Sequence, residues 1–282
     1  MSDELLRRFL DKLQRREAPG RRPAPHAPTM EDEATDPATL RVRGVEHGLF
    51  PSAASLNRDF AARSPRLRLT IDLGEEFRRR AARPDDRARE ALLRLCPTLP
   101  EHACADRQGL ESWLSGEAPS PASRARSEPE ADGLPVAHLV EHVALDLLSA
   151  ATPTGRRSGA ACAYRERPER YDVFFECDDP VLGRAAALLS AAAARDICLA
   201  PDRVDLHARC RSLVADLAQR GKSQVVAEDV AAARGWRVPE ALQALEALGR
   251  LGFLESIPAP FTFSSTTGLI FRRVAPDGPA DR

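Results

Sequence analysis

The chain has 282 residues, a length typical of one large domain or two small ones. Its 41 Lys and Arg residues balance 42 Asp and Glu residues, and the resulting net charge of -1 argues against binding nucleic acid through bulk charge. Apolar residues make up 43% of the chain and 23 residues are proline, so we expect compact domains that are joined or preceded by disordered stretches.

Cysteine usage and the lack of long apolar runs bear on where the protein resides. The six cysteines form no C-x-x-C pair and are expected to be reduced, mostly buried thiols. The N-terminal run MSDELLRRFLDKLQRRE is charged throughout, unlike a signal peptide, and no apolar run approaches the ~20 residues of a membrane span. We therefore expect a soluble, cytoplasmic protein that makes no membrane contact.

The first segment, residues 1–39, predicts an amphipathic helix on a disordered linker. Residues 4–17 place four large apolar side chains at helical spacing. These are Leu5, Phe9, Leu10 and Leu13. Residues 18–39 are rich in Pro, Gly and charged residues, a composition that cannot bury enough surface to fold. Residues 1–17, which contain this helix, are either a frayed extension or a docking peptide for a protein partner.

The second segment, residues 40–200, predicts an α+β domain in which helices pack on a mixed sheet. Strands are expected over residues 66–73, where polar and apolar residues alternate, over the bulky run at 171–177, and over 40–50. Helices are expected over residues 75–82, 86–95, 135–148 and 181–199. Residues 115–133, which are rich in Pro and Ser, are interpreted as a disordered insertion, the alternative being a lid.

The third segment, residues 201–282, predicts a module that resembles a winged helix-turn-helix. Three helices, with a tight turn at Gly235, precede a β-prone stretch. The helices are expected at 204–219, 223–234 and 239–251, and the β-prone stretch at 261–274. Winged helices bind DNA or proteins, so the fold does not decide the ligand. Because acidic residues nearly balance the arginines here, we favour protein docking or homodimerisation over nucleic-acid binding.

The strongest chemical signal is an H-x-x-E-H motif at His138, Glu141 and His142. On a helix, residues i and i+4 lie one above the other, so both imidazoles can reach one metal ion, with Glu141 on the same side. Zinc favours imidazole ligands, and a carboxylate beside an open coordination position can deprotonate a water molecule. The surrounding helix is largely apolar, so burying these three side chains unpaired would be costly. The alternative is a half-exposed helix whose polar stripe faces water.

A catalytic zinc site needs a third protein ligand from another element. Glu176 is the preferred candidate because it is an acid within a largely apolar strand, the alternative being a strand-end acid that points to solvent. The competitors are Asp146, one turn further along the motif helix, and His102. Asp146 fits better as a hydrogen-bond partner that fixes a histidine tautomer.

Four segments of the chain keep the order and spacing of a known family. They are LLRLCPTLPEH at 92–102, HLVEHVALDL at 138–147, YDVFFE at 171–176 and GRAA at 183–186. Together they resemble the N-terminal domain of cyanophycin synthetase, over a little more than half of the chain. In that family the domain is similar to a zinc metallopeptidase of the inverted H-x-x-E-H type, and in some members it hydrolyses polymer chains into primers.

The resemblance implies Zn²⁺ bound by His138 and His142, Glu141 as the general base and Glu176 as the third ligand. It also implies that Arg184 holds a substrate carboxylate bidentately, the alternative being a solvated side chain at a helix start. The family's ATP-grasp and Mur-ligase-like domains are missing, so we do not expect polymer synthesis. The loop at 158–165 departs from the family pattern, so specificity for cyanophycin is not implied.

We therefore expect a stand-alone zinc-dependent peptidase that hydrolyses a peptide or isopeptide bond. The rival hypothesis is a non-enzymatic regulator or scaffold, in which the winged-helix-like module binds a protein partner or DNA and the zinc site is structural or vestigial. Metal analysis of the purified protein and a salt-dependent gel shift separate these two hypotheses.

Overall fold

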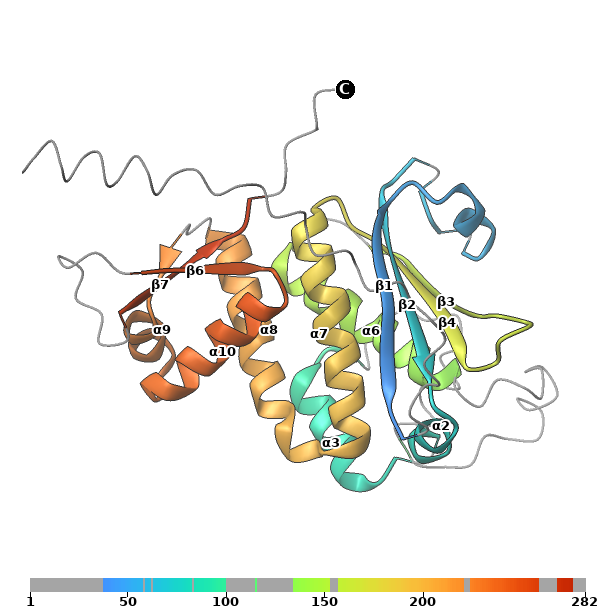
Figure 1. Cartoon of the computed structure of the whole chain (residues 1–282), viewed down its shortest axis with the longest axis horizontal. Helices are drawn as coiled ribbons and strands as arrows, with labels where there is room; N and C mark the ends of the chain where they lie inside the picture. The colour runs from blue at the N-terminus through green and yellow to red at the C-terminus, as the bar shows by residue number, and fades with distance from the viewer. Residues whose placement is uncertain are drawn as a thin grey trace, which may run out of the picture. The chain divides into compact units, whose positions relative to one another are not determined.

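The computed structural model of the chain describes residues 38–57, 59–61, 63–82, 84–99, 115, 134–152, 157–220, 224–258 and 268–275 (Figure 1). The predicted helix at 4–17, nearly all of the linker at 18–39 and His102 lie outside these residues. Residues 116–133 of the predicted insertion at 115–133 also lie outside the described residues.

A four-stranded sheet forms one layer of the described structure (Figure 1). Its strands are β1 (Leu40–Gly48), β2 (Arg66–Leu73), β3 (Gly159–Ala163) and β4 (Arg170–Glu176), in the order β1-β2-β4-β3. The strands predicted at 40–50, 66–73 and 171–177 are confirmed. The sequence does not predict β3, because its run GAACA lacks the β-branched and aromatic side chains that mark a strand.

Every neighbouring pair of strands in this sheet is antiparallel, so the prediction of a mixed sheet is wrong. β2 and β3 do run in the same direction, and the connection between them is long and helical, as two strands of the same direction in one sheet require. The hairpin from β3 to β4 then reverses the chain and inserts β4 between them. Each strand therefore meets only neighbours of opposite direction.

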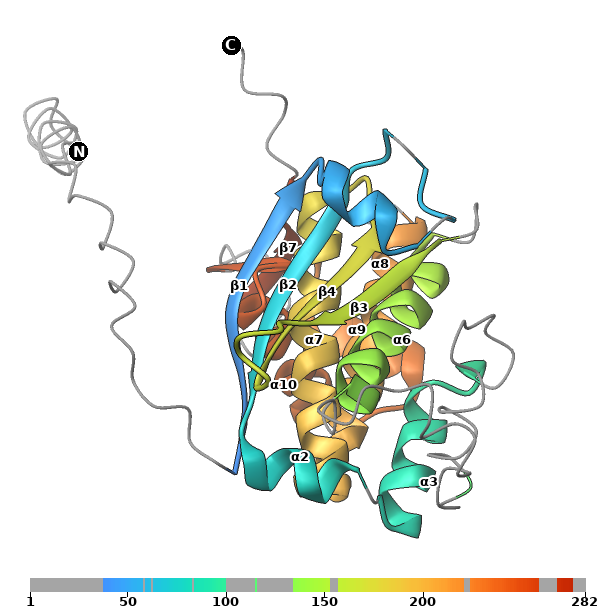
Figure 2. The ribbon, with the colours of Figure 1, turned by 90° about the vertical axis from the view of Figure 1, so that its right-hand side faces the viewer.

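Two long helices, α6 (Leu134–Ala151) and α7 (Pro180–Leu199), cover one face of the sheet, behind the strands in Figure 2. α6 packs on β3 and β4, and α7 packs on β1 and β2. Asp179 caps α7 by accepting hydrogen bonds from the Val181 and Leu182 amides. The shorter helices α2 (Glu75–Ala81) and α3 (Asp86–Leu95) follow β2. All four helices predicted for this segment are confirmed.

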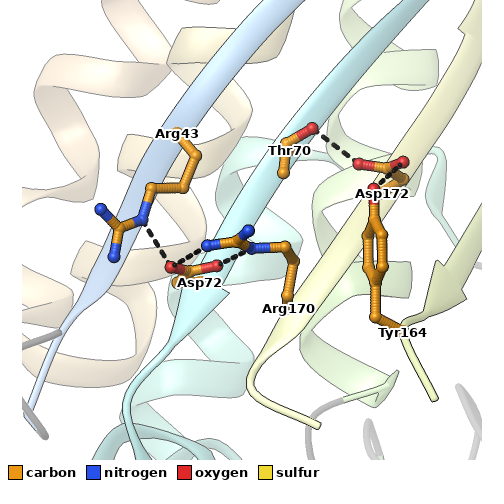
Figure 3. A network of polar contacts seen from close by, with 6 residues as sticks. All are labelled: Arg43, Thr70, Asp72, Tyr164, Arg170 and Asp172. Carbon is orange, nitrogen blue, oxygen red and sulfur yellow. Dashed lines mark hydrogen bonds and ion pairs between the residues drawn. The ribbon is translucent and has the colours of Figure 1, made fainter. Parts of the chain in front are cut away.

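The opposite face of the sheet carries polar side chains that bond to one another across the strands (Figure 3). Asp72 accepts hydrogen bonds from Arg43 at 2.5 Å and from Arg170 at 2.8 Å. Asp172 accepts from Thr70 at 2.6 Å and from the Tyr164 hydroxyl at 2.8 Å. These contacts tie β1, β2 and β4 together on the face that the long helices leave uncovered.

The short helix η1 (Pro51–Ser55) and the residues after it cover one end of that polar face (Figure 2). The Phe50 ring meets the Phe174 ring edge-on, with centroids 5.7 Å apart. Ala53, Phe60 and Phe174 form a small apolar cluster of their own on this side of the sheet. This end of the sheet is thus enclosed on both faces.

The C-terminal part combines three helices with a small antiparallel sheet. After the 3-10 turn η3 (Pro201–Arg203), its elements are α8 (Val204–Arg220), β5 (Gln224–Val225), α9 (Ala227–Arg234), α10 (Val238–Arg250), β6 (Leu254–Pro258) and β7 (Leu269–Arg273). The sheet order is β5-β7-β6. Gly235 ends α9 with a φ of +66°, the left-handed conformation that glycine adopts without strain.

The helix predicted at 223–234 begins later than expected. β5 occupies residues 224–225, and α9 starts at Ala227 with Val226 in the capping position. The predicted start at residue 223 is therefore too early, because the chain first pairs with β7 before it turns into α9. Strand pairing with a distant segment is a tertiary contact that local sequence cannot show.

One continuous apolar core runs from the four-stranded sheet through α6 and α7 to α8 and α10. The inward-facing β2 residues Leu67, Leu69 and Ile71 are fully buried in it. So are Leu245 and Leu248 of α10, which contacts α8 and α9. Among the described residues, none of the helices is long and apolar enough to cross a membrane.

Candidate functional site

The H-x-x-E-H residues lie on α6, which is enclosed by β3 and β4 on one side and by α7 and α8 on another. The His138 side chain is 17% exposed and reaches the surface. Glu141 and His142 are buried behind it, at 7% and 2% exposure. The alternative in which a polar stripe of this helix faces water therefore does not hold for two of the three residues.

The three side chains are brought together on one side of α6. The His138 and His142 ring centroids are 4.6 Å apart, and the two rings are tilted by 35°. His138 Nε2 lies 3.9 Å from Glu141 Oε2. This is the arrangement that helical spacing of i+3 and i+4 predicts.

The Glu141 carboxyl group packs directly against the start of β3. A Cβ atom built on Gly159 would lie 2.6 Å from Glu141 Oε1 and 2.8 Å from its Cγ, closer than real Cβ contacts. Only a residue without a side chain leaves room for Glu141 at this point. The Gly159 carbonyl in turn accepts a hydrogen bond from Asn57 Nδ2 at 2.7 Å.

Burial raises the pKa of Glu141 to about 8, because surroundings of low dielectric penalise the carboxylate. A carboxyl group that titrates near neutral pH can both accept and release a proton under physiological conditions. A cation placed beside it would favour the carboxylate form. The chemistry available on α6 is therefore two imidazoles and one acid–base group at the edge of the core.

Glu176 is buried at the end of β4, on the face of the sheet opposite to α6. Its Oε1 accepts a hydrogen bond from the Ala61 amide at 2.8 Å, and its Oε2 accepts one from the Ser158 amide at 3.4 Å. The alternative of an acid that points to solvent does not hold, since Glu176 is 9% exposed. Backbone amides of two loops, rather than solvent, surround this carboxylate.

Asp146 and Arg184 occupy different surroundings from the three motif residues. Asp146 is buried, and its carboxylate accepts hydrogen bonds from Thr98 Oγ1 and Arg211 Nε, each at 2.5 Å. It thereby links α6 to α8 and to the residues after α3. Arg184 is exposed on α7, and its Nε lies 4.0 Å from the position of a Cβ on Gly252, in the turn before β6. A role for Arg184 in holding a substrate carboxylate stays a prediction.

The donors on α6 fit part of a zinc site, namely two neighbouring imidazoles with a carboxyl group beside them. In the described ranges, no three His, Cys, Asp or Glu side chains are grouped so that they could hold a metal ion. Glu176 is thus not brought together with His138 and His142. His102, the remaining candidate for a third ligand, lies outside the described residues.

The described cysteines are free thiols, as the sequence predicts: Cys96, Cys162, Cys177, Cys198 and Cys210. Burial raises the pKa of Cys177 and of Cys162 to about 11. Burial likewise raises the pKa of Cys198 and of Cys210 to about 12. A thiol that stays protonated at neutral pH is a poor nucleophile, so these cysteines do not suggest covalent catalysis.

The roles of three residues around the motif are not predicted from the sequence. Gly159 makes room for Glu141, Asn57 holds Gly159, and the Ala61 amide binds Glu176. A glycine at the start of a run of small residues is the one signal available, because it often marks close approach of another group. The contacts of Asn57 and Ala61 depend on how η1 folds over the sheet, which no local pattern indicates.

No protein-family model matches this sequence, and a search of curated proteins gives no match.

Proposed function

We propose that the protein is a zinc-dependent peptidase that hydrolyses a peptide or isopeptide bond. The observation that carries this proposal is the grouping of His138, Glu141 and His142 on one side of α6, with Glu141 buried against Gly159. Two imidazoles and a neighbouring carboxyl group are two of the three metal ligands and the general base that such a hydrolase uses.

In this proposal His138 and His142 hold the metal, and a third ligand comes from outside the motif. Bound zinc supplies a Lewis acid that polarises the scissile carbonyl and acidifies water. The remaining chemistry belongs to the protein. His138 lies at the protein surface, where a substrate can reach it, while the packing of Glu141 and His142 keeps bulk water from their inner sides.

Glu141 serves as the general base and then as the general acid. Its Oε2 faces His138, and its Oε1 lies against the Gly159 backbone, so the carboxyl group is held in one orientation. It takes a proton from the attacking water and later gives that proton to the leaving amine. Burial raises the pKa of Glu141, and a zinc ion beside it would lower that pKa toward the carboxylate form that a general base needs.

The test compares Glu141→Gln with His138→Ala in the full chain. Glu141→Gln keeps both imidazoles, so we expect it to retain zinc and to lose at least ~100-fold in turnover, the usual contribution of a general base. His138→Ala should lose zinc and turnover together. Zinc is measured by metal analysis, and turnover by digestion of a peptide library that includes Asp–Arg isopeptides.

A matched control is His47→Ala. His47 lies on β1 and bonds to the Cys177 carbonyl, away from α6, so this variant should keep both zinc and turnover. Full hydrolytic activity of His138→Ala in the absence of zinc would contradict the proposed mechanism.

We also propose that the C-terminal part is a winged-helix-like module that docks a protein, either a partner or a second copy of the chain. The element order α8-β5-α9-α10-β6-β7 with the sheet order β5-β7-β6 supports this assignment. The exposed residues of α10 are Pro239, Gln243, Glu246 and Arg250. They carry no net charge, so a salt-dependent gel shift should reveal no phosphate-driven DNA binding.

A further inference from the structure

Residues 57 and 59–61, here called the strap, cross the end of the sheet beside β3 and β4. Two side chains bind the backbone of Ala61, one at its N–H and the other at its carbonyl. The Glu176 carboxylate accepts a hydrogen bond from the Ala61 N–H at 2.8 Å, and Arg66 Nη2 donates to the Ala61 carbonyl at 2.5 Å. Arg66 and Glu176 are direct cross-strand neighbours on β2 and β4.

Burying this pair of charges is costly unless their hydrogen-bonding groups are satisfied. Arg66 is 1% exposed and Glu176 is 9% exposed. Most of their polar atoms bind backbone groups of the strap and its neighbours. Arg66 Nη1 also donates to the Phe50 carbonyl at 3.4 Å, and the guanidinium lies 4.6 Å from the Phe60 ring centroid, while the buried Arg66 Nε has no hydrogen-bond partner. The hydrogen bonds of Arg66 and Glu176 thus go to the backbone of the strap and of its neighbours, which supports a role in fixing the strap.

The strap is joined in turn to the residues that enclose Glu141. Asn57 Nδ2 donates to the Gly159 carbonyl at 2.7 Å, and Ser158 Oγ donates to the Asp59 carbonyl at 3.3 Å. Glu176 adds a third connection through the Ser158 amide at 3.4 Å. The start of β3 is thus fastened from the far face of the sheet while Gly159 contacts Glu141 on the near face.

We infer, on the basis of the peptidase proposed above, that Glu176 and Arg66 are positioning residues for Glu141 and that Glu176 is not a metal ligand. They act through the strap and Gly159, which keep the Glu141 carboxyl group in place. The carboxylate of Glu176 is directed toward two backbone amides across the sheet from His138 and His142, and no metal-holding group includes it in the part of the chain that is described.

The experiment uses Glu176→Gln, Glu176→Ala and the milder Asn57→Ala in the full chain. A surface glutamate provides the control Glu46→Ala, because Glu46 bonds only to Arg68 on the same exposed face among the described contacts. Three quantities are measured: zinc content, kcat and KM separately, and hydrogen exchange of the segments 59–61 and 157–163.

All three site variants should keep the zinc content of the wild type. Exchange of both segments should accelerate about tenfold or more in Glu176→Ala, since the Ala61 and Ser158 amides lose their acceptor. The kcat should fall on the order of 10- to 100-fold with little change in KM, as expected when a catalytic group is misplaced. Glu176→Gln should recover part of the loss, because its amide oxygen can still accept from Ala61.

Loss of zinc from Glu176→Gln, with zinc retained by Glu46→Ala, would make Glu176 a ligand and overturn the assignment. Unchanged exchange at 157–163 in both Glu176→Ala and Asn57→Ala would overturn it as well. Hydrogen exchange requires neither zinc nor substrate. A wild-type protein that binds no zinc and hydrolyses nothing would therefore refute the peptidase, while the exchange data would still decide whether the strap holds β3.

Discussion

At the residue scale, the contact between Gly159 and Glu141 determines the surroundings of the motif carboxyl group. A carboxyl group is seldom buried without a partner, and this one has a pKa raised to about 8 by its surroundings. The bare backbone of Gly159 allows β3 to close over it. The spacing of His138, Glu141 and His142 is visible in the sequence because a helix turns every 3.6 residues. The role of Gly159 is not, because it depends on where β3 docks.

Gly159→Ala should destabilise the protein and displace Glu141. The new Cβ would meet the Glu141 side chain at 2.6 Å, and relieving this overlap should cost about 1–3 kcal/mol in the free energy of unfolding. Turnover should fall together with stability. Denaturant titration and steady-state kinetics measure the two effects.

Gly44→Ala on β1 is the control for this substitution. No atom lies within 4 Å of a Cβ built on Gly44, so its unfolding free energy should change by less than about 0.5 kcal/mol. Equal losses of stability in the two variants would show that the strand position, rather than the contact with Glu141, is responsible.

At the element scale, sequence reasoning succeeds where a periodic pattern is strong. β2 alternates apolar and polar residues from Arg66 to Leu73, and α7 is a long Ala-rich run, so both are predicted almost to the residue. β3, β5 and β6 are missed, because they are short, β3 consists mainly of small residues, and their pairing depends on tertiary contacts. The position of β4 between β2 and β3 is equally hidden, and it makes the sheet antiparallel.

The ion pairs on the open face of the sheet predict how stability responds to acid. Burial of Asp72 raises its pKa, but hydrogen bonds from Arg170 and Arg43 outweigh this effect and hold the pKa below its ordinary value (Figure 3). A depressed carboxyl pKa adds stability above the unfolded pKa of about 4, and this stability is lost as the pH falls through the folded value.

Asp72→Asn should therefore lose about 1–3 kcal/mol of unfolding free energy at pH 7, the range for hydrogen bonds to charged groups. Its stability should then fall less steeply than that of the wild type below pH ~4. Denaturant titrations from pH 3 to pH 7 measure both effects. Asp202→Asn removes an exposed ion pair with Arg87 and should follow the wild-type profile. Parallel profiles for wild type and Asp72→Asn would contradict the assigned role of Asp72.

At the scale of the whole molecule, the C-terminal part shares its core with the sheet domain. α8 packs on α3, α6 and α7, and the ion pair between the buried Asp146 and the partly exposed Arg211 joins α8 to the helix that carries the motif. α10 contacts α8, and α8 contacts α6, so a partner docked on α10 would be connected to His142 through α8 and α6. Sequence composition indicates a change of character near residue 200, but it does not show that one apolar core continues across that point.

Charge at this scale bears on the proposal that α10 docks a protein rather than DNA. The whole chain has a net charge of -1, and the exposed α10 residues Gln243, Glu246 and Arg250 are neutral in sum. DNA affinity depends chiefly on neutralising phosphates, and a protein with 6–10 phosphate contacts loses ~10³–10⁵-fold in affinity between 50 and 200 mM salt. We expect neither appreciable binding nor this salt dependence from the full chain in a gel shift with genomic fragments.

Two variants of α10 make this expectation decisive. Glu246→Arg adds positive charge to the exposed face and should create weak, salt-sensitive DNA binding that the wild type lacks. Arg250→Ala should leave the wild-type result unchanged. The contrary outcome is tight DNA binding by the wild type that weakens steeply with salt and is lost in Arg250→Ala. It would identify α10 as a DNA-binding helix, because an arginine on a helix that faces the groove contacts phosphates or bases.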